Sequence, residues 1–207
     1  MDGTAKRARS VDQKAERQKA ILSAARGLIS DLGFDGVTMS ALAKRAQVAK
    51  GTLYLYVRSK EELFLLLFVE AMEDVVTRFE AEACADQLPE QLTRLVSDTP
   101  LFLPLYARLA AVIEANVADE PLFAAKRRIL ATSNRFSNKL ATLLEVPPAR
   151  AEALSLVLFQ ALLGAAQLDL PSGRDPATLP ADLRDSFAVH QFDRAFPPSV
   201  RHILGVD

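Results

Sequence analysis

Several residue types are scarce in this sequence of 207 residues, and each scarcity excludes a class of protein or site. The single cysteine, Cys84, rules out a disulfide framework within the chain. The two histidines, His190 and His202, are too few and too scattered for a zinc or iron site. We therefore expect no bound metal and no structural disulfide.

The sequence also lacks the motifs of common catalytic sites. It contains no G-x-S-x-G, no H-E-x-x-H and no phosphate-binding glycine loop, so we expect neither an enzyme nor a cofactor. The N-terminal segment MDGTAKRARS has no apolar core of the kind that signal peptides need. We judge the apolar runs too short to span a membrane, and we predict a cytoplasmic protein with no membrane contact.

Charge, in contrast, is present in quantity and is unevenly distributed. Residues 1–60 contain 12 Lys and Arg against 5 Asp and Glu, whereas residues 61–207 contain 13 against 21. The first part is therefore strongly basic and the second acidic, although the whole chain has a net charge of −1. This asymmetry predicts that the N-terminal part contacts a polyanion. The alternative is a chance cluster of solvated charges.

Apolar residues recur at three- and four-residue steps along most of the chain, and no segment alternates as a strand would. Half of all residues are apolar, which is enough for a sizeable core. The sequence therefore predicts an all-α fold with about nine helices. The predicted helices are 14–32, 39–46, 50–57, 60–85, one opened by Pro89 within 88–100, and then 100–117, 120–145, 149–170 and 181–196, the last ended by Pro197 and Pro198.

Three parts follow from this pattern. Residues 1–13 carry basic side chains without apolar periodicity, and they predict a flexible basic arm. Residues 14–60 predict a three-helix head in which two short helices are joined by a tight turn, the arrangement of a helix-turn-helix DNA-binding domain. Residues 61–207 predict a second, wholly helical domain.

The stretch VAKGTLYLYVRSKEELF, residues 48–64, has the chemistry of a DNA-binding surface. Gly51 permits a close approach of the backbone to a groove wall, and Thr52 offers a hydroxyl and a methyl group to base edges. The two tyrosine hydroxyls can reach phosphate oxygens, and Lys60 stands at a helix start, which favours a phosphate. The alternative is that the tyrosines only pack.

The segment GFDGVTMSALAKRAQVAKGTLYLYVRSKEELF resembles the DNA-binding head of the tetracycline-repressor (TetR) family. The shared features are G-F before a threonine cap, T-x-x-x-L-A-x-x-A-x-V, K-G-T-L-Y-x-Y and S-K-E-E-L. The resemblance covers about residues 21–68, and it implies a helix-turn-helix head followed by a C-terminal ligand-binding and dimerisation domain. The residues that it implies contact DNA are Thr38 and Lys60 at phosphates and Lys50, Gly51, Thr52, Tyr54, Leu55 and Tyr56 on the recognition surface.

Two residues depart from the family pattern. Gln47 stands where a turn glycine is usual, so we expect a strained or altered turn. Ala49 replaces the usual serine or threonine, which removes an N-cap hydroxyl from the recognition helix.

The resemblance also implies a homodimer, because one recognition helix makes too few contacts for specific binding. Residues 153–170 are apolar almost all round, as a helix buried between two subunits would be. The alternative is that this segment is the core helix of one subunit. The residues predicted for the dimer interface are Val157, Ala161, Gly164, Ala165, Leu168 and Phe187.

An effector pocket is expected among the middle helices, which are rich in phenylalanine. Gln160 and Gln167 lie seven residues apart on one face of an otherwise apolar helix, and buried amides need partners such as a ligand. At each aromatic position, core packing is the alternative. The residues predicted to contact a lipophilic small molecule are Phe68, Met72, Phe102, Tyr106, Phe123, Phe136, Phe159, Gln160 and Gln167.

Together these features predict a ligand-responsive transcriptional regulator, a repressor that binds an inverted-repeat operator in double-stranded DNA as a homodimer. Two alternatives stay open. One is a DNA-binding regulator controlled by a protein partner, and the other is an enzyme or carrier with a non-functional head.

Overall fold

The computed structural model describes residues 2–168, 179–182, 184 and 191–205, with side chains described from Gln13 onward. The prediction of an all-α fold is confirmed, and these residues form nine α-helices. Their bounds are α1 (Asp2–Leu32), α2 (Met39–Arg45), α3 (Lys50–Leu53), α4 (Lys60–Glu82), α5 (Leu88–Ser97), α6 (Phe102–Arg108), α7 (Asp119–Leu144), α8 (Pro148–Leu168) and α10 (Phe192–Leu204).

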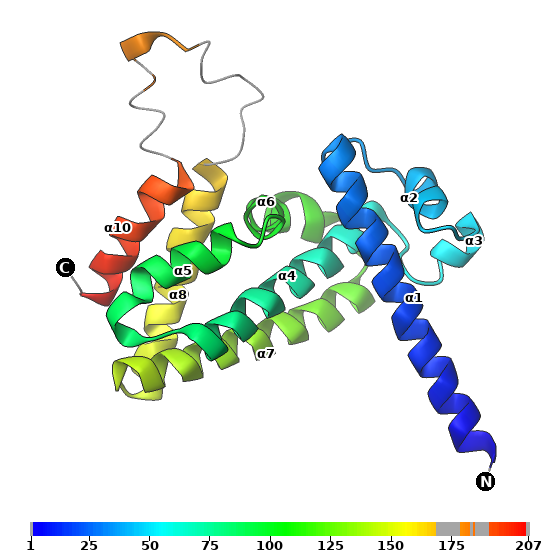
Figure 1. The fold of residues 1–207 in the computed structure, drawn as a ribbon, viewed down its shortest axis with the longest axis horizontal. Helices are drawn as coiled ribbons and strands as arrows, with labels where there is room; N and C mark the ends of the chain where they lie inside the picture. Colours follow the sequence, from blue (N-terminus) through cyan, green and yellow to red (C-terminus); the bar gives the residue numbers. More distant parts are fainter. Residues whose placement is uncertain (1, 169–178, 183, 185–190, 206–207) are drawn as a thin grey trace.

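The helices are arranged as a small head and a larger body (Figure 1). Helices α1, α2 and α3 form the head, and α4 runs from the head into the body. In the body, α4 packs along α7, and α8 packs against α6, α7 and α10. Helix α4 belongs to the body, and six residues, 54–59, separate it from α3, so it connects the head directly to the body.

The capping of α4 explains where it begins. Ser59 Oγ accepts a hydrogen bond from Glu62 N at 3.0 Å, as the predicted capping box requires. In return, Glu62 Oε2 accepts from Arg58 N at 2.8 Å, one residue earlier than in the usual box. The backbone amides of Arg58 and Glu62 thus both have side-chain acceptors, and these two hydrogen bonds stabilise the junction between head and body.

Helix α1 begins at Asp2, whereas the sequence predicted a flexible arm over residues 1–13 and a helix from Lys14. The prediction relied on apolar periodicity, which gives no signal before Ile21. Alanine, lysine, arginine and glutamine make up half of residues 2–13 and have high helix propensity. A helix nucleated by buried residues extends into such a segment at little cost, so the predicted start was too late.

The segment 100–117 is not the single regular helix that the sequence predicted. Helix α6 ends at Arg108 and is followed by a π-helical turn, Leu109–Ile113, and a short 3-10 turn, Glu114–Asn116. Leu109 and Ile113 are both buried. The sequence contains no proline or glycine that would signal the change of helix type.

The last helix also differs from its prediction. Helix α10 starts at Phe192 and continues through Pro197 and Pro198, which were predicted to end it. The predicted residues 183 and 185–190 lie outside the described residues. Each proline removes one backbone hydrogen bond. Burial of Phe192, Phe196 and Val200 against the rest of the body offsets this loss.

Helix α8 is long and apolar enough to span a membrane by length and composition alone, which corrects the prediction that no run is long enough. A core helix of a globular protein passes the same test. Leu154, Leu158 and Leu162 of α8 are at most 8% exposed and face the chain's own core. Other positions on α8 stay exposed.

Candidate nucleic-acid interface and effector cavity

The head is held together by a small apolar core. Ile21 and Leu28 of α1, Leu42 of α2 and Leu53 of α3 are each at most 5% exposed. Val57, just after α3, is fully buried beside them. Because Leu53 in α3 and Val57 just after it are both buried, the orientation of α3 is fixed although it has only one helical turn.

The start of α2 is fixed by Thr38, as predicted. The Thr38 hydroxyl oxygen accepts a hydrogen bond from Ala41 N at 3.1 Å, and the residue is extended, with φ −124° and ψ 153°. Because the hydroxyl is the acceptor in this bond, its own proton can be donated to a phosphate oxygen. The side chain lies on the exposed surface of the head.

The turn between α2 and α3 has the strain that the sequence predicted at Gln47. Gln47 has φ +54°, a left-handed conformation that favours glycine. Gln47 N donates to Lys44 O at 3.2 Å, and Val48 N donates to Ala43 O at 3.0 Å. These two bonds form a Schellman motif, which ends α2 sharply and turns the chain into α3.

Helix α3 is shorter than predicted. It covers Lys50–Leu53 rather than residues 50–57, and the chain then continues in tighter turns, with Leu55 N donating to Thr52 O at 3.1 Å. Ala49 stands at the N-cap and makes no side-chain capping bond, as its departure from the family pattern predicted. The missing cap leaves amides of the first turn without a side-chain acceptor, but it does not account for the early end of the helix, which lies at the other terminus.

The outer surface of α3 carries the predicted DNA-contacting residues. Lys50, Gly51 and Thr52 are exposed, Tyr54 is 42% exposed and Leu55 is 75% exposed. A Cβ atom added at Gly51 would meet nothing within 4 Å. The packing of the chain itself therefore does not require a glycine there, and the open space lies on the side from which a DNA groove would approach.

Tyr56 and Lys60 are placed differently from the residues of α3. Tyr56 is half-buried and packs against the core of the head, so the alternative that one tyrosine partly packs holds for Tyr56 rather than for Tyr54. Lys60 is the first residue of α4 and is also partly buried. Its position combines a cationic side chain with the free amides of a helix start.

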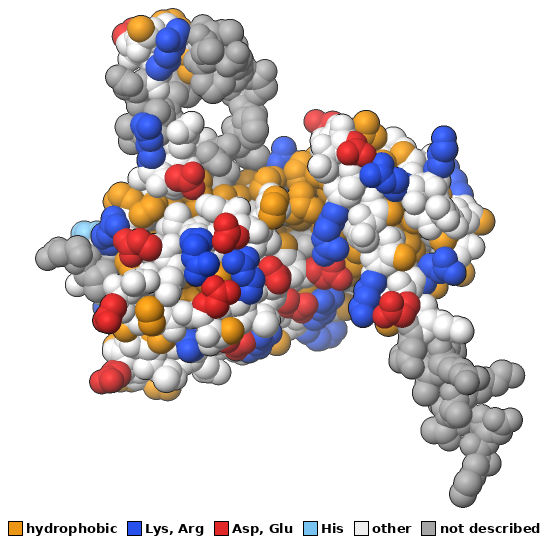
Figure 2. All heavy atoms as spheres, viewed as in Figure 1, with side chains coloured by type: hydrophobic (Ala, Val, Ile, Leu, Met, Phe, Trp, Pro, Cys, Tyr) orange, Lys and Arg blue, Asp and Glu red, His pale blue; other side chains and the backbone are white. Residues whose placement is uncertain are grey.

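Basic side chains without an ion pair occur in both the head and the body. Among the described residues, five basic side chains of the head take part in no ion pair: Lys14, Arg17, Lys44, Lys50 and Lys60. In the body, six basic side chains pair with carboxylates, namely Arg78, Arg94, Lys126, Arg128, Arg135 and Arg201, and five others form no ion pair with a described residue. Figure 2 shows blue and red side chains lying next to each other over the body. The head thus keeps cations available for an external anion.

The body contains a small cavity of about 40 Å³ at the junction of six helices. This is close to the volume of one water molecule, so the cavity holds no organic effector as it stands. Every lining residue is apolar, which also disfavours a trapped water. The lining residues are Met72, Val75, Val76, Leu92, Val96, Phe102, Phe136, Leu158, Phe159, Leu162 and Phe196.

Four of the predicted effector contacts line this cavity, namely Met72, Phe102, Phe136 and Phe159. The structure places two more in the layer behind it. Phe68 stacks on Phe102 with ring centroids 5.7 Å apart, and on Tyr106 at 5.5 Å.

Tyr106 is the polar group nearest to this aromatic layer. Its hydroxyl donates to the carbonyl oxygen of Phe159 at 3.2 Å. Burial raises the pKa of Tyr106 to about 12, so the hydroxyl stays protonated at neutral pH.

Three of the predicted effector residues lie away from the cavity. Phe123 is 52% exposed on the outside of α7, and Gln160 and Gln167 are exposed on the outside of α8. The argument that these amides are buried and need a partner is therefore wrong for the single chain. Sequence reasoning missed Phe196, because α10 was expected to end there.

The exposed face of α8 is apolar. Leu156, Val157 and Leu168 are 60%, 44% and 59% exposed, and Gln160 and Gln167 lie among them. These five residues are called the outer face of α8 below.

The predicted dimer residues divide between two sides of α8. Val157 and Leu168 lie on the outer face, and a Cβ at Gly164 would meet nothing within 4 Å. Ala161 and Ala165 instead pack against the chain's own core. Phe187 lies outside the described residues.

Comparison with protein-family models accounts for most of the chain. The model of bacterial regulatory proteins, tetR family, matches residues 21–67. A model of the tetracyclin repressor-like C-terminal domain matches residues 66–206.

Two curated proteins are similar over part of their length. The HTH-type transcriptional repressor KstR of Mycolicibacterium smegmatis is 32% identical over 117 residues, which are 53% of this chain and 57% of that protein. The fatty acid metabolism regulator protein of Bacillus subtilis is 37% identical over 70 residues, which are 34% and 36% of the two chains. The chain thus spans about half the length, or less, of these curated relatives.

Among solved structures, the transcriptional regulator SCO7222 from Streptomyces coelicolor, a TetR, has a similar fold. Its TM-score is 0.59 at 20% sequence identity, and the match covers 91% of this chain and 95% of that one. This similarity concerns the arrangement of helices in both the head and the body.

Proposed function

The chain belongs to the tetR family of bacterial regulatory proteins, and from this premise we propose that it is a cytoplasmic, ligand-responsive repressor that binds an inverted-repeat operator as a homodimer. The observation that carries the DNA-binding part is the outer surface of α3 and of the residue that follows it. There Lys50, Thr52 and Tyr54 are exposed beside Gly51, and Lys50 forms no ion pair with a described residue.

Each part of this surface has a separate task. The side chains of α3 read base edges in a major groove, where a threonine methyl and hydroxyl distinguish bases. Thr38 and Lys60 flank α3 and hold phosphates, which positions the head without reading sequence. Ion pairs would compete with these contacts, so free cations favour binding to a polyanion.

The outer face of α8 supports the homodimer. It exposes Leu156, Val157 and Leu168 on a helix that is otherwise a core element. A second copy of the same helix, related by a two-fold axis, would cover this face and let Gln160 and Gln167 bond across the interface. The glutamines thereby acquire a role that the single chain does not give them. Two heads would then reach successive major grooves, about 34–36 Å apart.

A lipophilic effector is supported by the wholly apolar lining of the body cavity. One relative is described as a fatty acid metabolism regulator, which agrees with this chemistry. Because the cavity measures only about 40 Å³, the effector enters by moving aromatic side chains such as Phe102 and Phe159. Such movement acts on α4 through Met72, and α4 carries the head. Tenfold operator release requires about 1.4 kcal/mol of preference for the altered state.

Selection of bound fragments from the source genome by the purified protein, at two salt concentrations, tests the DNA-binding part. We expect recovery of one or a few sites that contain an inverted repeat. On the recovered operator, Tyr54→Ala is expected to weaken binding about tenfold, since a hydrogen bond to a charged group is worth about 1.5–3 kcal/mol. Arg150→Ala, on the exposed start of α8, is the control and should bind as the unchanged protein does.

Thermal-shift measurements with saturated fatty acids of graded length test the effector part. We expect a rise in the melting temperature and release of the operator by the same compounds. Operator binding that no lipophilic compound relieves would refute the effector while leaving the DNA-binding function intact.

A further inference from the structure

We propose that the first half of α1 forms a second phosphate-binding site, in which Lys14 and Arg17 hold the DNA backbone beside the segment that α3 contacts. The inference rests on the proposed DNA-binding function and extends it to residues outside the helix-turn-helix. Both cations precede residue 21, where the match to the family model of the head begins.

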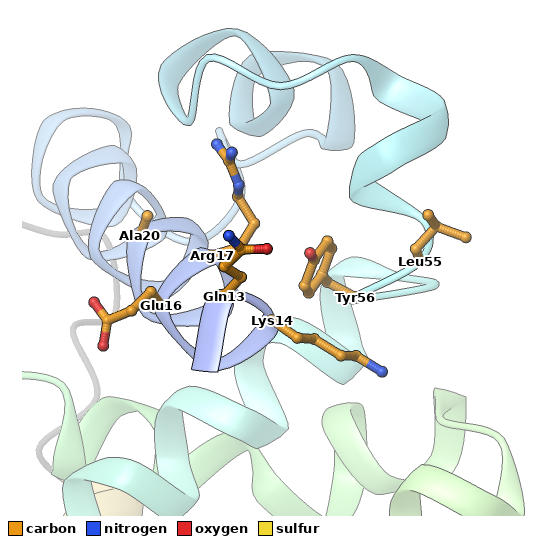
Figure 3. Close-up of a pocket in the computed structure, with 7 residues that line it drawn as sticks. All are labelled: Gln13, Lys14, Glu16, Arg17, Ala20, Leu55 and Tyr56. Atoms are coloured by element: carbon orange, nitrogen blue, oxygen red, sulfur yellow. The ribbon is translucent and has the colours of Figure 1, made fainter. Parts of the chain in front are cut away.

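A hollow of about 1110 Å³ lies between α1 and the turn that follows α3 (Figure 3). One wall is α1, and the other is formed by Leu55 and Tyr56. Figure 3 shows the Tyr56 ring directed toward Gln13 and Arg17 across the hollow. The residues that line it are Gln13, Lys14, Glu16, Arg17, Ala20, Leu55 and Tyr56.

The side chains that line the hollow carry more positive than negative charge, and the two cations form no ion pair with a described residue. Lys14 and Arg17 are exposed, and neither forms an ion pair with any described residue. The single carboxylate in the lining, Glu16, bonds to Lys19 at 3.0 Å instead. In Figure 3 the Glu16 carboxylate points away from Tyr56. Two cations, together with the Gln13 amide and the Tyr56 hydroxyl, thus supply donors suited to phosphate oxygens.

The apolar part of the lining matches the sugar of a nucleotide. Leu55 is 75% exposed and provides an apolar surface at the edge of the hollow. Leu55 stands on the side of the hollow toward which the Lys14 side chain extends (Figure 3), so a deoxyribose placed on Leu55 would bring its phosphate toward Lys14. This combination of apolar wall and cationic edge favours a sugar–phosphate backbone over a purely apolar partner.

The hollow is continuous with the recognition surface. Leu55 and Tyr56 belong to both, since they follow α3 directly in the chain. Helix α1 continues without a break past the hollow to Asp2, so Lys14 and Arg17 stand on a regular helix (Figure 1). The site therefore lies where the backbone of a duplex bound to α3 passes.

The double variant Lys14→Gln with Arg17→Gln tests the site. Both side chains are exposed and have no described partner, so the variant is expected to fold and to keep its melting temperature. The probe is the operator duplex recovered by genomic selection, titrated between 50 and 300 mM salt, about the range in which phosphate contacts are lost. The matched control is Lys139→Gln with Arg150→Gln, which removes the same charge from the body.

Each phosphate contact contributes about 0.9 to the slope of log K against log salt. We expect the double variant to flatten this slope by about 1.8, and the control to leave it unchanged. Phosphate-ethylation interference should show positions on the operator that matter for the unchanged protein and not for the variant.

An unaltered slope and an unaltered interference pattern in the double variant, with normal binding by the unchanged protein, would overturn this site and leave the proposed function standing. Failure of the unchanged protein to bind any duplex would overturn both. A slope that falls equally in the variant and in the control would show an effect of total charge alone, which also overturns the site.

Discussion

The head and the body use the same kinds of residue for opposite purposes. In the body, aromatic rings pack on one another, and arginines close on carboxylates across neighbouring helices, as Arg128 does with Glu73 at 2.7 Å. In the head, Tyr54 and Leu55 remain exposed just after α3, beside Lys50, which forms no ion pair with a described residue. The two regions therefore differ in this one surface, because ion-paired and unpaired basic side chains occur in both.

The connection between the two regions combines apolar and polar contacts, because Phe34 packs edge-on against Phe64 of α4, with ring centroids 5.4 Å apart. Arg26 of α1 pairs with Glu70 of α4, and Arg58 pairs with Glu120 at 3.4 Å. The Arg108 guanidinium lies over the Phe34 ring, 4.7 Å from its centroid. Exposed ion pairs contribute little, about 0–1 kcal/mol each. The buried apolar contacts with α4 therefore contribute more to holding the head than these exposed ion pairs do.

The largest expected effect is a loss of stability in the body, caused by a substitution that leaves the surface of the head unchanged. Phe68 is 2% exposed and stacks on two rings, so Phe68→Ala should lower the free energy of unfolding by about 3–5 kcal/mol. Urea unfolding followed by circular dichroism measures this. Phe123→Ala, at a position that is 52% exposed, is the matched control and should change stability by less than about 0.5 kcal/mol. Equal losses in both variants would mean that the aromatic cluster is not the stabilising unit.

Local signals in the sequence predicted the head well. The caps at Thr38 and Ser59 and the strain at Gln47 each depend on residues within three or four positions, and all three are confirmed. The course of α10 through Pro197 depends instead on burial of residues from distant helices, which outweighs the local preference.

The predicted effector residues show a second limit of prediction from sequence, which is the choice of helix face. An apolar helix with two glutamines could face a pocket, a partner or solvent, and the sequence alone does not distinguish these environments. The structure shows that Gln160 and Gln167 point away from the cavity, because Leu158 and Leu162 occupy the inner face of α8. The helical period was correct, and the choice of face was wrong.

A smaller effect on stability is expected from a substitution in the turn between α2 and α3 of the head. Gln47→Gly should raise the free energy of unfolding by about 1 kcal/mol, because a side chain in the left-handed region costs about 1–2 kcal/mol and glycine avoids most of it. Chemical denaturation measures the gain. Gln47→Ala is the control, since it keeps the Cβ atom that causes the strain, and it should bring no gain. If alanine stabilises as much as glycine, side-chain effects other than φ explain the result.

The smallest effect concerns the ion pairs that join α4 and α7. The hydrogen bond from Arg135 lowers the pKa of Glu80, so the pair contributes stability above the usual glutamate pKa near 4.5 and loses it as pH falls through the lower, folded-state value. Glu80→Gln should therefore cost less than about 1 kcal/mol at pH 7, because the pair is partly exposed, and still less below pH 4.5.

Unfolding of both proteins in urea at pH 7 and in steps from pH 5 to 3 measures this difference, within the range over which carboxylates titrate. A cost that stays constant through the whole range would mean that the charge of Glu80 is not the source of the loss, since glutamine keeps the methylene groups and one acceptor oxygen. A stability cost of Glu80→Gln that disappears at low pH would show that the ion pair between Glu80 and Arg135 stabilises the contact between α4 and α7. Loss of Lys60 from the head, where the structure describes no ion-pair partner, should then have no comparable acid dependence.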